Sequence, residues 1–385
     1  MRAYAFSWKN GAGWQTPGAL PDGAQLVFYF GARGDLETGA RYAELSAMFP
    51  KAHVVGCSTG GQIRDDEVSD DEIAAVALSF DATRLRLECQ DVLAPEQSWR
   101  CGVALGEKLA AADLAGIFIL SDGLNVNGSQ LVAGIASIVG DRIPLTGGLA
   151  GDGPSFQSTV VGADCPPRDR MVAAVGLYGP AVRIGHGSAG GWDNFGPRRR
   201  VTRSIGNVLY ELDGEPALDL YERYLGEEDT KGLPSTALLF PLRVFEPEKP
   251  DSDIVRTVLG VDREARTMTF AGDVPQGWVA QLMRGNFDRL AAGAAEAARQ
   301  TRTQTESDGH SGDELALLVS CIGRRLLMGQ NIIDEVESVG AELGGSVTRL
   351  GFYSYGEISP NQRSGVSQLH NQTMTIATIS EAGHA

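Results

Sequence analysis

The chain has 385 residues, 43% of them hydrophobic, which suits a packed globular core divided among about two or three domains. Its net charge of −16 argues against general nucleic-acid binding, because phosphate contacts need basic surface. No apolar run reaches the roughly 18 residues of a membrane-spanning helix and no signal peptide is evident, so we expect a cytoplasmic protein without membrane insertion, whose five separate cysteines stay reduced.

The first half of the sequence alternates strand patterns with helix patterns. The predicted strands are 25–32, 53–58, 73–80, 84–91, 116–122, 144–149, 171–179 and 182–192. The predicted helices are 36–49, 98–111 and 129–139. Such alternation indicates a layered α/β domain with at least partly parallel strand pairing.

Three of these strands end in small or polar residues: GCSTGG at 56–61, SDGLNVNG at 121–128 and GGLAGDG at 147–153. Ligands of α/β sheets gather at the carboxyl ends of strands, and glycine lets the backbone approach them closely. We therefore expect the ends at 56–61 and 147–153 to lie near each other in one sheet. None of the three matches GxGxxG or a P-loop, so we predict no dinucleotide or P-loop site. The acidic stretch 65–72 is interpreted as a solvated turn.

The composition shifts in the second half, and we place a domain boundary near Phe195. The segment 196–204 is predicted as a basic turn whose arginines face an acidic partner, haem propionates or solvent: Arg198, Arg199, Arg200 and Arg203. Further along, we predict a helix over 279–300, a polar surface loop over 303–313, and a strand from 316 that continues into helix as far as 337.

The segment 351–376 gathers polar side chains that a purely structural hairpin would not need. It predicts a β-hairpin with strands at 351–358 and 372–379 around a long loop, which brings together Tyr353, Tyr355, Glu357, His370 and Asn371. The alternative is structural: the tyrosines pack, Glu357 pairs with an arginine, and His370 caps a turn.

Motifs in both halves carry a family resemblance. The segments VVGCSTGG, SDGLNVNG and TGGLAGDGPSF, followed by LDGEPALDLYERYLG, SCIGRR, GFYSYGEISP and HNQT, resemble FIST N and FIST C domains in order. The resemblance implies an α/β fold of two mixed-sheet α/β domains with a shared interface, FIST N over 1–195 and FIST C over 196–385. It also implies an intracellular signal-sensing module that binds a small ligand.

A module without further domains is also similar to the NosP group of haem-containing nitric-oxide sensors. That resemblance implies a separate partner, either a histidine kinase or a cyclic-di-GMP enzyme (a diguanylate cyclase or phosphodiesterase). The sequence contains no kinase, cyclase or helix-turn-helix segment, so the output is expected to pass through such a partner. An imidazole can ligate haem iron, and His370 is the first candidate axial ligand. His186, among small residues in GHGSAGG, is the second, and a structural role is the alternative for both.

A catalytic reading rests on Cys57, which follows glycine at a strand end. A cysteine nucleophile needs a base and a lowered pKa, and only His370 is offered as a base, for a hydrolase or amidotransferase. Cys321 raises the same question. No spacing supports such a pair, so we expect small buried cysteines and no enzymatic activity.

The ligand site is predicted between the two halves. Glu357 and Arg324 either form an ion pair or hold the ammonium and carboxylate ends of an amino acid, and Asp122 or Asp152 could serve in the same way. The predicted ligand-binding residues are His370, Glu357, Tyr353, Tyr355, Asn371 and Arg324 of the second half and Gly56, Cys57, Ser58 and Asp152 of the first.

Overall fold

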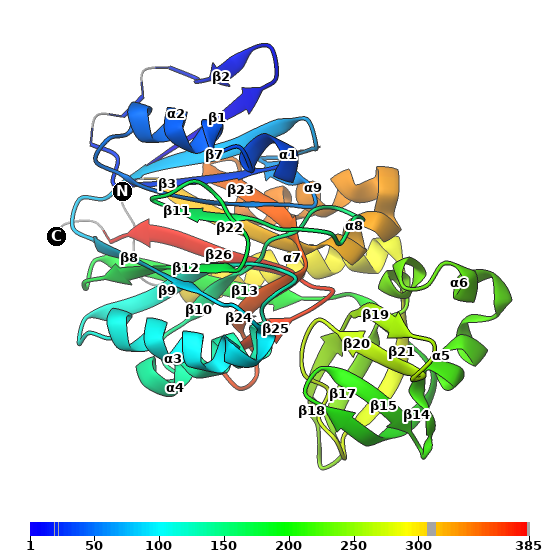
Figure 1. The fold of residues 1–385 in the computed structure, drawn as a ribbon. Coiled ribbons are helices and arrows are strands. Elements are labelled where there is room, and N and C mark those ends of the chain that lie inside the picture. Colours follow the sequence, from blue (N-terminus) through cyan, green and yellow to red (C-terminus); the bar gives the residue numbers. More distant parts are fainter. Residues whose placement is uncertain (19, 22, 306–312, 383–385) are drawn as a thin grey trace.

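The computed structural model describes residues 1–18, 20–21, 23–305 and 313–382, which form a mixed α/β fold (Figure 1). Within these residues the strands make four sheets, three of six strands and one of eight. The predicted α/β class is therefore confirmed. Short 3-10 helices lie at Pro95–Gln97, Ser235–Leu239 and Gly329–Asn331.

The N-terminal sheet contains the first predicted strands. Its strands, in spatial order, are β11 (Val161–Ala163), β4 (His53–Ser58), β3 (Leu26–Gly31), β7 (Glu72–Ser79), β1 (Arg2–Lys9) and β2 (Gly13–Gln15). Every residue of β3 is buried, because both faces of the sheet are covered. Val27 packs in a cluster with Leu45 of α2 (Ala40–Met48), which follows the short α1 (Arg33–Leu36). The alternate side chains, such as Phe28, point to the opposite face.

The middle sheet joins segments from both halves of the sequence. Its strands, in spatial order, are β25 (Ser367–His370), β24 (Gly356–Pro360), β10 (Leu145–Leu149), β9 (Leu114–Ser121), β12 (Met171–Tyr178) and β8 (Arg84–Asp91). Figure 1 shows α3 (Ser98–Leu109) and α4 (Gly128–Val139) packed together on the outer side of this sheet.

The C-terminal sheet is also mixed. Its strands, in spatial order, are β13 (Val182–Ala189), β26 (Met374–Glu381), β22 (Glu314–Cys321), β23 (Val347–Ser354), β5 (Gln62–Arg64) and β6 (Glu67–Ser69). The helices that belong to it are α7 (Phe287–Thr305), α8 (Ile322–Met328) and α9 (Ile332–Leu343). The predicted strand and helix between 316 and 337 are thus confirmed, with a break between α8 and α9.

These three sheets share one plan. Each central strand (β3, β9 or β22) has a parallel neighbour on one side and an antiparallel neighbour on the other. Beyond the parallel neighbour lies a strand contributed by a part of the chain whose other strands form a different sheet: β11 beside β4, β24 beside β10, and β5 beside β23. The sheets therefore exchange strands in a closed cycle around the centre of the molecule.

The inner faces of the three sheets meet in one apolar core. The ring centroid of Phe28 in β3 lies 5.0 Å from that of Phe118 in β9. The ring of Phe30, also in β3, lies 4.6 Å from that of Phe352 in β23. One continuous core of this kind gives the predicted shared interface between the halves of the chain.

The eight-stranded sheet forms a lobe of its own, seen at the lower right of Figure 1. Its strands are β18 (Lys249–Arg256), β17 (Leu242–Glu246), β21 (Val279–Gly285), β14 (Trp192–Ile205), β15 (Val208–Leu212), β20 (Thr267–Phe270) and β19 (Val258–Asp262), with β16 (Glu215–Pro216) paired to β15. It packs with α5 (Ala217–Leu225) over a separate apolar core, and α6 (Glu227–Lys231) follows. The boundary predicted at Phe195 falls inside β14, so the chain does not change from one sheet to another there.

Two local predictions in this lobe are wrong. Residues 196–204 lie within a strand rather than a turn, because the backbone at 198–200 pairs with β21 and the backbone at 201–205 pairs with β15. The guanidinium carbon of Arg203 lies 4.4 Å from the ring centroid of Tyr210. Residues 279–285 form β21, since they pair with β14 and β17, and the predicted helix begins only at Phe287. The predicted loop over 303–313 lies mostly outside the described residues.

The predicted C-terminal hairpin is correct only at its centre. Strands β24 and β25 pair, which places Glu357 directly opposite His370. The flanking strands β23 and β26 do not pair with each other, because β22 lies between them. The tyrosines consequently point to other parts of the molecule.

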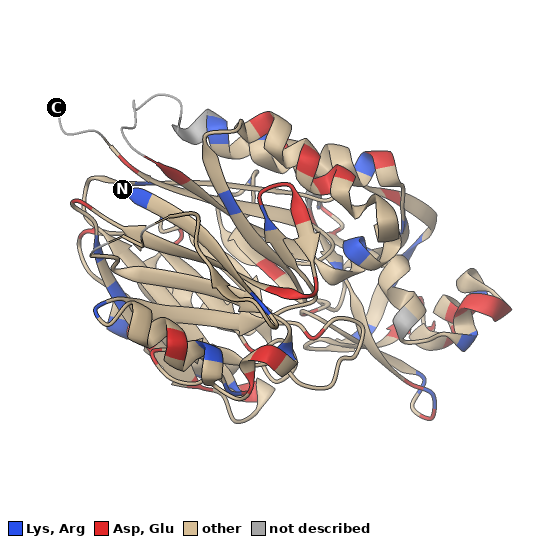
Figure 2. Cartoon of the chain, turned by 90° about the horizontal axis from the view of Figure 1, so that it is seen from above, with Lys and Arg blue, Asp and Glu red and all other residues tan. Residues whose placement is uncertain are grey.

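Charged residues lie mostly on the outer helices, loops and strand ends, while the sheets are largely uncharged (Figure 2). No helix in the described part of the chain combines the length and the apolar character needed to span a bilayer.

Candidate functional site

Three backbone hydrogen bonds join the ends of β4, β10 and β23 in a ring. Gly151 N donates to Ser58 O at 2.9 Å, Tyr355 N donates to Leu149 O at 3.2 Å, and Gly60 N donates to Tyr353 O at 2.7 Å. The predicted proximity of the 56–61 and 147–153 ends is confirmed. The expectation that they share one sheet is wrong, because β4 and β10 belong to different sheets, whose ends this ring of hydrogen bonds joins.

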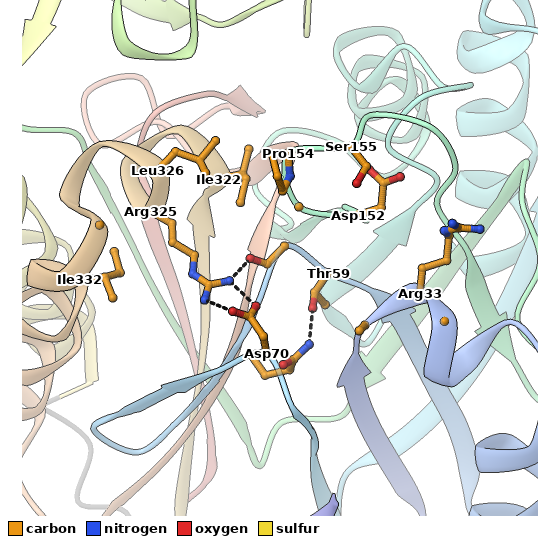
Figure 3. Close-up of a pocket in the computed structure, with 16 residues that line it drawn as sticks. Arg33, Thr59, Asp70, Asp152, Pro154, Ser155, Ile322, Arg325, Leu326 and Ile332 are labelled. Carbon is orange, nitrogen blue, oxygen red and sulfur yellow. Dashed lines mark hydrogen bonds and ion pairs between the residues drawn. The ribbon is translucent and has the colours of Figure 1, made fainter. Parts of the chain in front are cut away.

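A cavity of about 610 Å³ opens beside this ring (Figure 3). Its walls come from both halves of the sequence, in segments that follow the carboxyl ends of β3, β4, β10 and β22. The lining residues are Ala32, Arg33, Gly34, Thr59, Gly60, Gln62, Asp70, Asp152, Gly153, Pro154 and Ser155 of the first half and Ile322, Arg325, Leu326, Gly329 and Ile332 of the second. This volume lies within the range typical of small-molecule sites, about 300–1,000 Å³.

Arg325 of α8 is the central charged group of this cavity. Its Nη1 and Nη2 contact Oδ1 and Oδ2 of Asp70 at 2.7 and 2.8 Å, and Nη1 also donates to Gly60 O. The guanidinium carbon lies 5.3 Å from the ring centroid of Tyr353, at cation–π distance. Gly61 has φ +130°, and a Cβ there would overlap Nη1 of Arg325, so the backbone must be glycine for the guanidinium to lie against it.

The two ends of the cavity differ in chemistry. Ile322, Leu326 and Ile332 give an apolar wall beside Arg325. At the opposite end lie Arg33 and Asp152 (Figure 3). A small ligand with a charged end and an apolar portion would match this arrangement.

Asp152 is held firmly at the wall. Its Oδ2 accepts from the backbone N–H groups of Gln157 at 2.9 Å and Ser158 at 3.0 Å. The hydroxyl of Tyr355 donates to its Oδ1, and Tyr355 stacks on Phe156 with centroids 4.4 Å apart. Burial raises the pKa of Tyr355, which therefore stays a phenol and a donor. Tyr355 thus positions Asp152 and does not itself line the cavity.

Gln62 anchors the turn that carries Asp70. In the amide orientation that satisfies its neighbours, Gln62 donates to Ser69 O at 2.6 Å and Glu72 O at 3.1 Å, on either side of Asp70. Its oxygen accepts from Ala32 N at 3.1 Å and from the hydroxyl of Thr59 at 2.8 Å. The backbone of the turn is thereby fixed to the floor of the cavity.

Arg324 and Glu357, predicted either to pair with each other or to hold the two ends of an amino acid, bind different partners and line no part of the main cavity. Arg324 is fully buried and its Nε donates to Oε1 of Glu335 at 2.6 Å, while its Nη groups donate to carbonyl oxygens that include Leu290 O at 2.8 Å. Tyr353 donates to Oε2 of the same Glu335 at 3.1 Å. Arg324, Tyr353 and Glu335 therefore form a buried polar centre. Arg324 points into this centre while Arg325 faces the cavity, because consecutive residues of an α-helix point about 100° apart.

Glu357 is buried beside that centre. Ser354 Oγ, Thr373 N and Thr373 Oγ1 donate to its carboxylate at 2.9, 3.1 and 2.9 Å. Burial nevertheless raises the pKa of Glu357 to about 8. Asn371, also buried, places its Nδ2 3.5 Å from Tyr355 O. Neither side chain lines the main cavity.

His370 lies at a second cavity, of about 340 Å³, between the lobe and the β24–β25 hairpin. Its Nε2 donates to Ser359 O at 3.0 Å, and burial lowers the pKa of the imidazole to about 4, so the ring is neutral at pH 7. His186, on β13, lines neither this cavity nor the main one. The two histidines therefore do not meet at one site.

The main cavity does not fit a haem, because none of its lining residues is a histidine, cysteine, methionine or tyrosine, the usual ligands of haem iron. The second cavity offers two such side chains, His370 and Met283. The Nε2 of His370 is already bonded to Ser359 O, so only its Nδ1 is left for a metal. Among the described residues, no group of three or more His, Cys, Asp or Glu side chains is placed to hold a metal ion.

Residues 56–58 do not line the main cavity but lie in the buried strand directly before its lining residues Thr59 and Gly60. Cys57 is fully buried in the central core, and burial raises its pKa well above the usual thiol value. Ser58 accepts from Val160 N at 3.0 Å through its hydroxyl, and a Cβ on Gly56 would overlap the carbonyl oxygen of Tyr29. Burial also raises the pKa of Cys321. Burial keeps both thiols protonated at neutral pH, which disfavours either cysteine as a nucleophile.

Sequence reasoning missed Arg325, Asp70 and Arg33, whereas Thr59 lies in the predicted strand end 56–61 without having been singled out. The motif SCIGRR contains Arg324 and Arg325, but only the rotation of α8 about its axis decides which of the two faces the cavity. Asp70 was interpreted as part of a solvated turn, and nothing local distinguishes it from the neighbouring acids. Asp122, the other predicted aspartate, holds a loop instead, accepting from Leu124 N at 2.7 Å and Arg170 N at 2.6 Å.

Comparison with known families gives two matches along the chain. Residues 25–215 match the model of the FIST N domain, and residues 217–360 match the model of the FIST C domain. A comparison with curated proteins gives no match. Among solved structures the chain is similar to a cyanuric acid hydrolase from A. caulinodans, with a TM-score of 0.40, 9% identity and 99% of each chain covered. A likeness of that degree bears on neither mechanism nor ligand.

Proposed function

Because the chain belongs to the FIST family, with a FIST N domain followed by a FIST C domain, we propose that the cavity beside Arg325 is the ligand site of a sensor. FIST domains are signal-sensing modules that bind small ligands. We propose a non-catalytic role for this chain, in which ligand binding is the whole chemical event.

The observation that carries this proposal is the origin of the cavity walls. The FIST N region supplies Thr59, Asp70 and Asp152, and the FIST C region supplies Arg325 and Ile322. A ligand held between two regions changes the free energy of their contact, which is what a sensor needs. Sites at the carboxyl ends of strands and between domains are also the usual places for small molecules.

The chemistry of the walls favours a small polar metabolite such as an amino acid. The fork of Arg325 suits a carboxylate, and the fixed carboxylate of Asp152 suits an ammonium group. The apolar wall of Ile322, Leu326 and Ile332 would take a side chain. We propose that a separate signalling protein, a histidine kinase or a cyclic-di-GMP enzyme, reads the bound state.

The test is to block the cavity without disturbing the fold. Ser155 is exposed and lines the cavity, whereas Gln157 is exposed in the same loop and does not. The twenty amino acids are tested by calorimetry against the unmodified protein, Ser155→Trp and Gln157→Trp. We expect binding to survive in Gln157→Trp and to be lost in Ser155→Trp. Equal binding by both variants would place the site elsewhere.

Haem with nitric oxide is the second candidate, favoured by one observation. The neutral imidazole of His370 lines a cavity whose walls include Trp192, Val255 and Met283. There His370 would hold the iron, which supplies the nitric-oxide chemistry when haem is bound. The absorption spectrum after haem reconstitution tests this: a Soret band present in His186→Ala and lost in His370→Ala supports it, and no band in the unmodified protein removes it.

A further inference from the structure

We propose that the side chain of Asp70 occupies the place of the ligand's own carboxylate, so that binding exchanges one carboxylate for another on Arg325. This inference rests on the proposed function and specifies it in two respects. It names the ligand class, a small carboxylic acid. It also names the internal group that the ligand must displace.

Arg325 is fixed independently of Asp70. Its guanidinium lies over the ring of Tyr353, donates to Gly60 O, and rests against the backbone of Gly61, where a side chain would overlap it. Its side chain is only 19% exposed. A cation held in this way keeps its orientation when its carboxylate partner changes, and such preorganisation lowers the cost of binding.

Asp70, in contrast, is easily replaced. Its side chain is 67% exposed, and its only described ion pair is the one with Arg325. Ion pairs with an exposed member contribute little, since water solvates the released carboxylate well. Gln62 holds the backbone on both sides of Asp70, so the exchange requires rotation of one side chain and no movement of the turn.

The geometry favours a carboxylate over a phosphate. Each oxygen of Asp70 meets a different Nη nitrogen of Arg325, at 2.7 and 2.8 Å, which is the planar two-point contact that carboxylates make. Asp152 and the displaced Asp70 both remain at the cavity, and two carboxylates repel a doubly charged phosphate more than a singly charged carboxylate.

The exchange alters the contact between the two family regions. In the structure Asp70 of the FIST N region is bonded directly to α8 of the FIST C region. Nearby, the β5–β6 turn stays attached through Asp66, whose Oδ1 lies 3.0 Å from Nη2 of Arg349. A bound carboxylate therefore replaces one link between the regions and leaves the neighbouring link in place.

Acetate is the probe for this exchange. Its binding is measured as the saturable rise of the unfolding midpoint at constant ionic strength, with chloride as reference. The variants are Asp70→Asn and its neighbour Asp71→Asn, which removes the same charge from a residue with no ion pair in the described structure. We expect Asp70→Asn to bind acetate about two- to fivefold more tightly than Asp71→Asn, because an exposed competitor is gone. Arg325→Gln, with Arg325→Lys as a second variant, should lose the acetate effect.

The outcomes separate this inference from the proposed function. Equal acetate affinity in Asp70→Asn and Asp71→Asn, with the effect still lost in Arg325→Gln, overturns the exchange and leaves the cavity as the ligand site. Unchanged acetate binding in Arg325→Gln overturns both. Tighter binding of inorganic phosphate than of acetate overturns the carboxylate class.

Discussion

Replacing Arg324 should destabilise this protein strongly, whereas the same replacement of its neighbour Arg325 should cost little stability. In Arg324→Met the carboxylate of Glu335 stays fully buried without its cation, and breaking a buried ion pair from one side costs about 3–5 kcal/mol. The carbonyl oxygens of Gly190 and Leu290 each also lose one hydrogen bond. Arg325→Met removes a partly exposed pair, for which about 0–1 kcal/mol is expected.

Urea unfolding at pH 7 measures both free energies, and a double-mutant cycle isolates the pair. Glu335→Gln keeps acceptors for Ser320 and Tyr353, so the double variant with Arg324→Met should lose clearly less than the sum of the single variants. If Arg324→Met cost no more than Arg325→Met, the buried ion pair would not be the structural centre described above.

Three further predictions concern other buried residues. The pKa of Glu357 is about 8 in the folded chain and ordinarily about 4.5, so between these values the folded state binds a proton that the unfolded state has lost. Stability should therefore fall as pH rises from about 4.5 through 8, by at most about 5 kcal/mol. Glu357→Gln should lack this loss in urea unfolding measured across that range. Gly56→Ala should lower the free energy of unfolding by at least about 1–3 kcal/mol, since its Cβ would overlap Tyr29 O. An unchanged urea midpoint would show that β3 and β4 can move apart there. Cys57 should resist iodoacetamide at neutral pH while the exposed Cys89 reacts, and mass spectrometry showing equal labelling would contradict its burial.

The sequence predicted those features that depend on local pattern. Alternating strand and helix patterns predicted the α/β class, and the apolar run at 25–32 predicted a strand, which the structure shows to be buried along its whole length as β3. The glycine-rich ends at 56–61 and 147–153 indicated where strands converge. The helix predicted over 279–300 is wrong at 279–285, because that stretch is compatible with helix or strand and its pairing with β14 makes it a strand.

The composition of the site could not be predicted in the same way. Arg324 and Arg325 are chemically identical neighbours, and their burial depends on how α8 packs against α9 and β23. Asp70 reaches Arg325 because β5 and β6 join a sheet whose other strands lie far along the chain. Contacts across more than 250 residues leave no trace in local periodicity.

The cyclic exchange of strands also determines how long strand edges stay unpaired while the chain is being synthesised. On the ribosome, β10 emerges about 200 residues before β24, the strand that covers its edge. At about 5–20 residues per second, that edge waits about 10 to 40 seconds with its backbone groups unpaired. The hairpin of β5 and β6 waits longer still for β23. Exposed strand edges invite pairing with other chains, so nascent copies of this protein should depend on cellular chaperones until the last strands emerge.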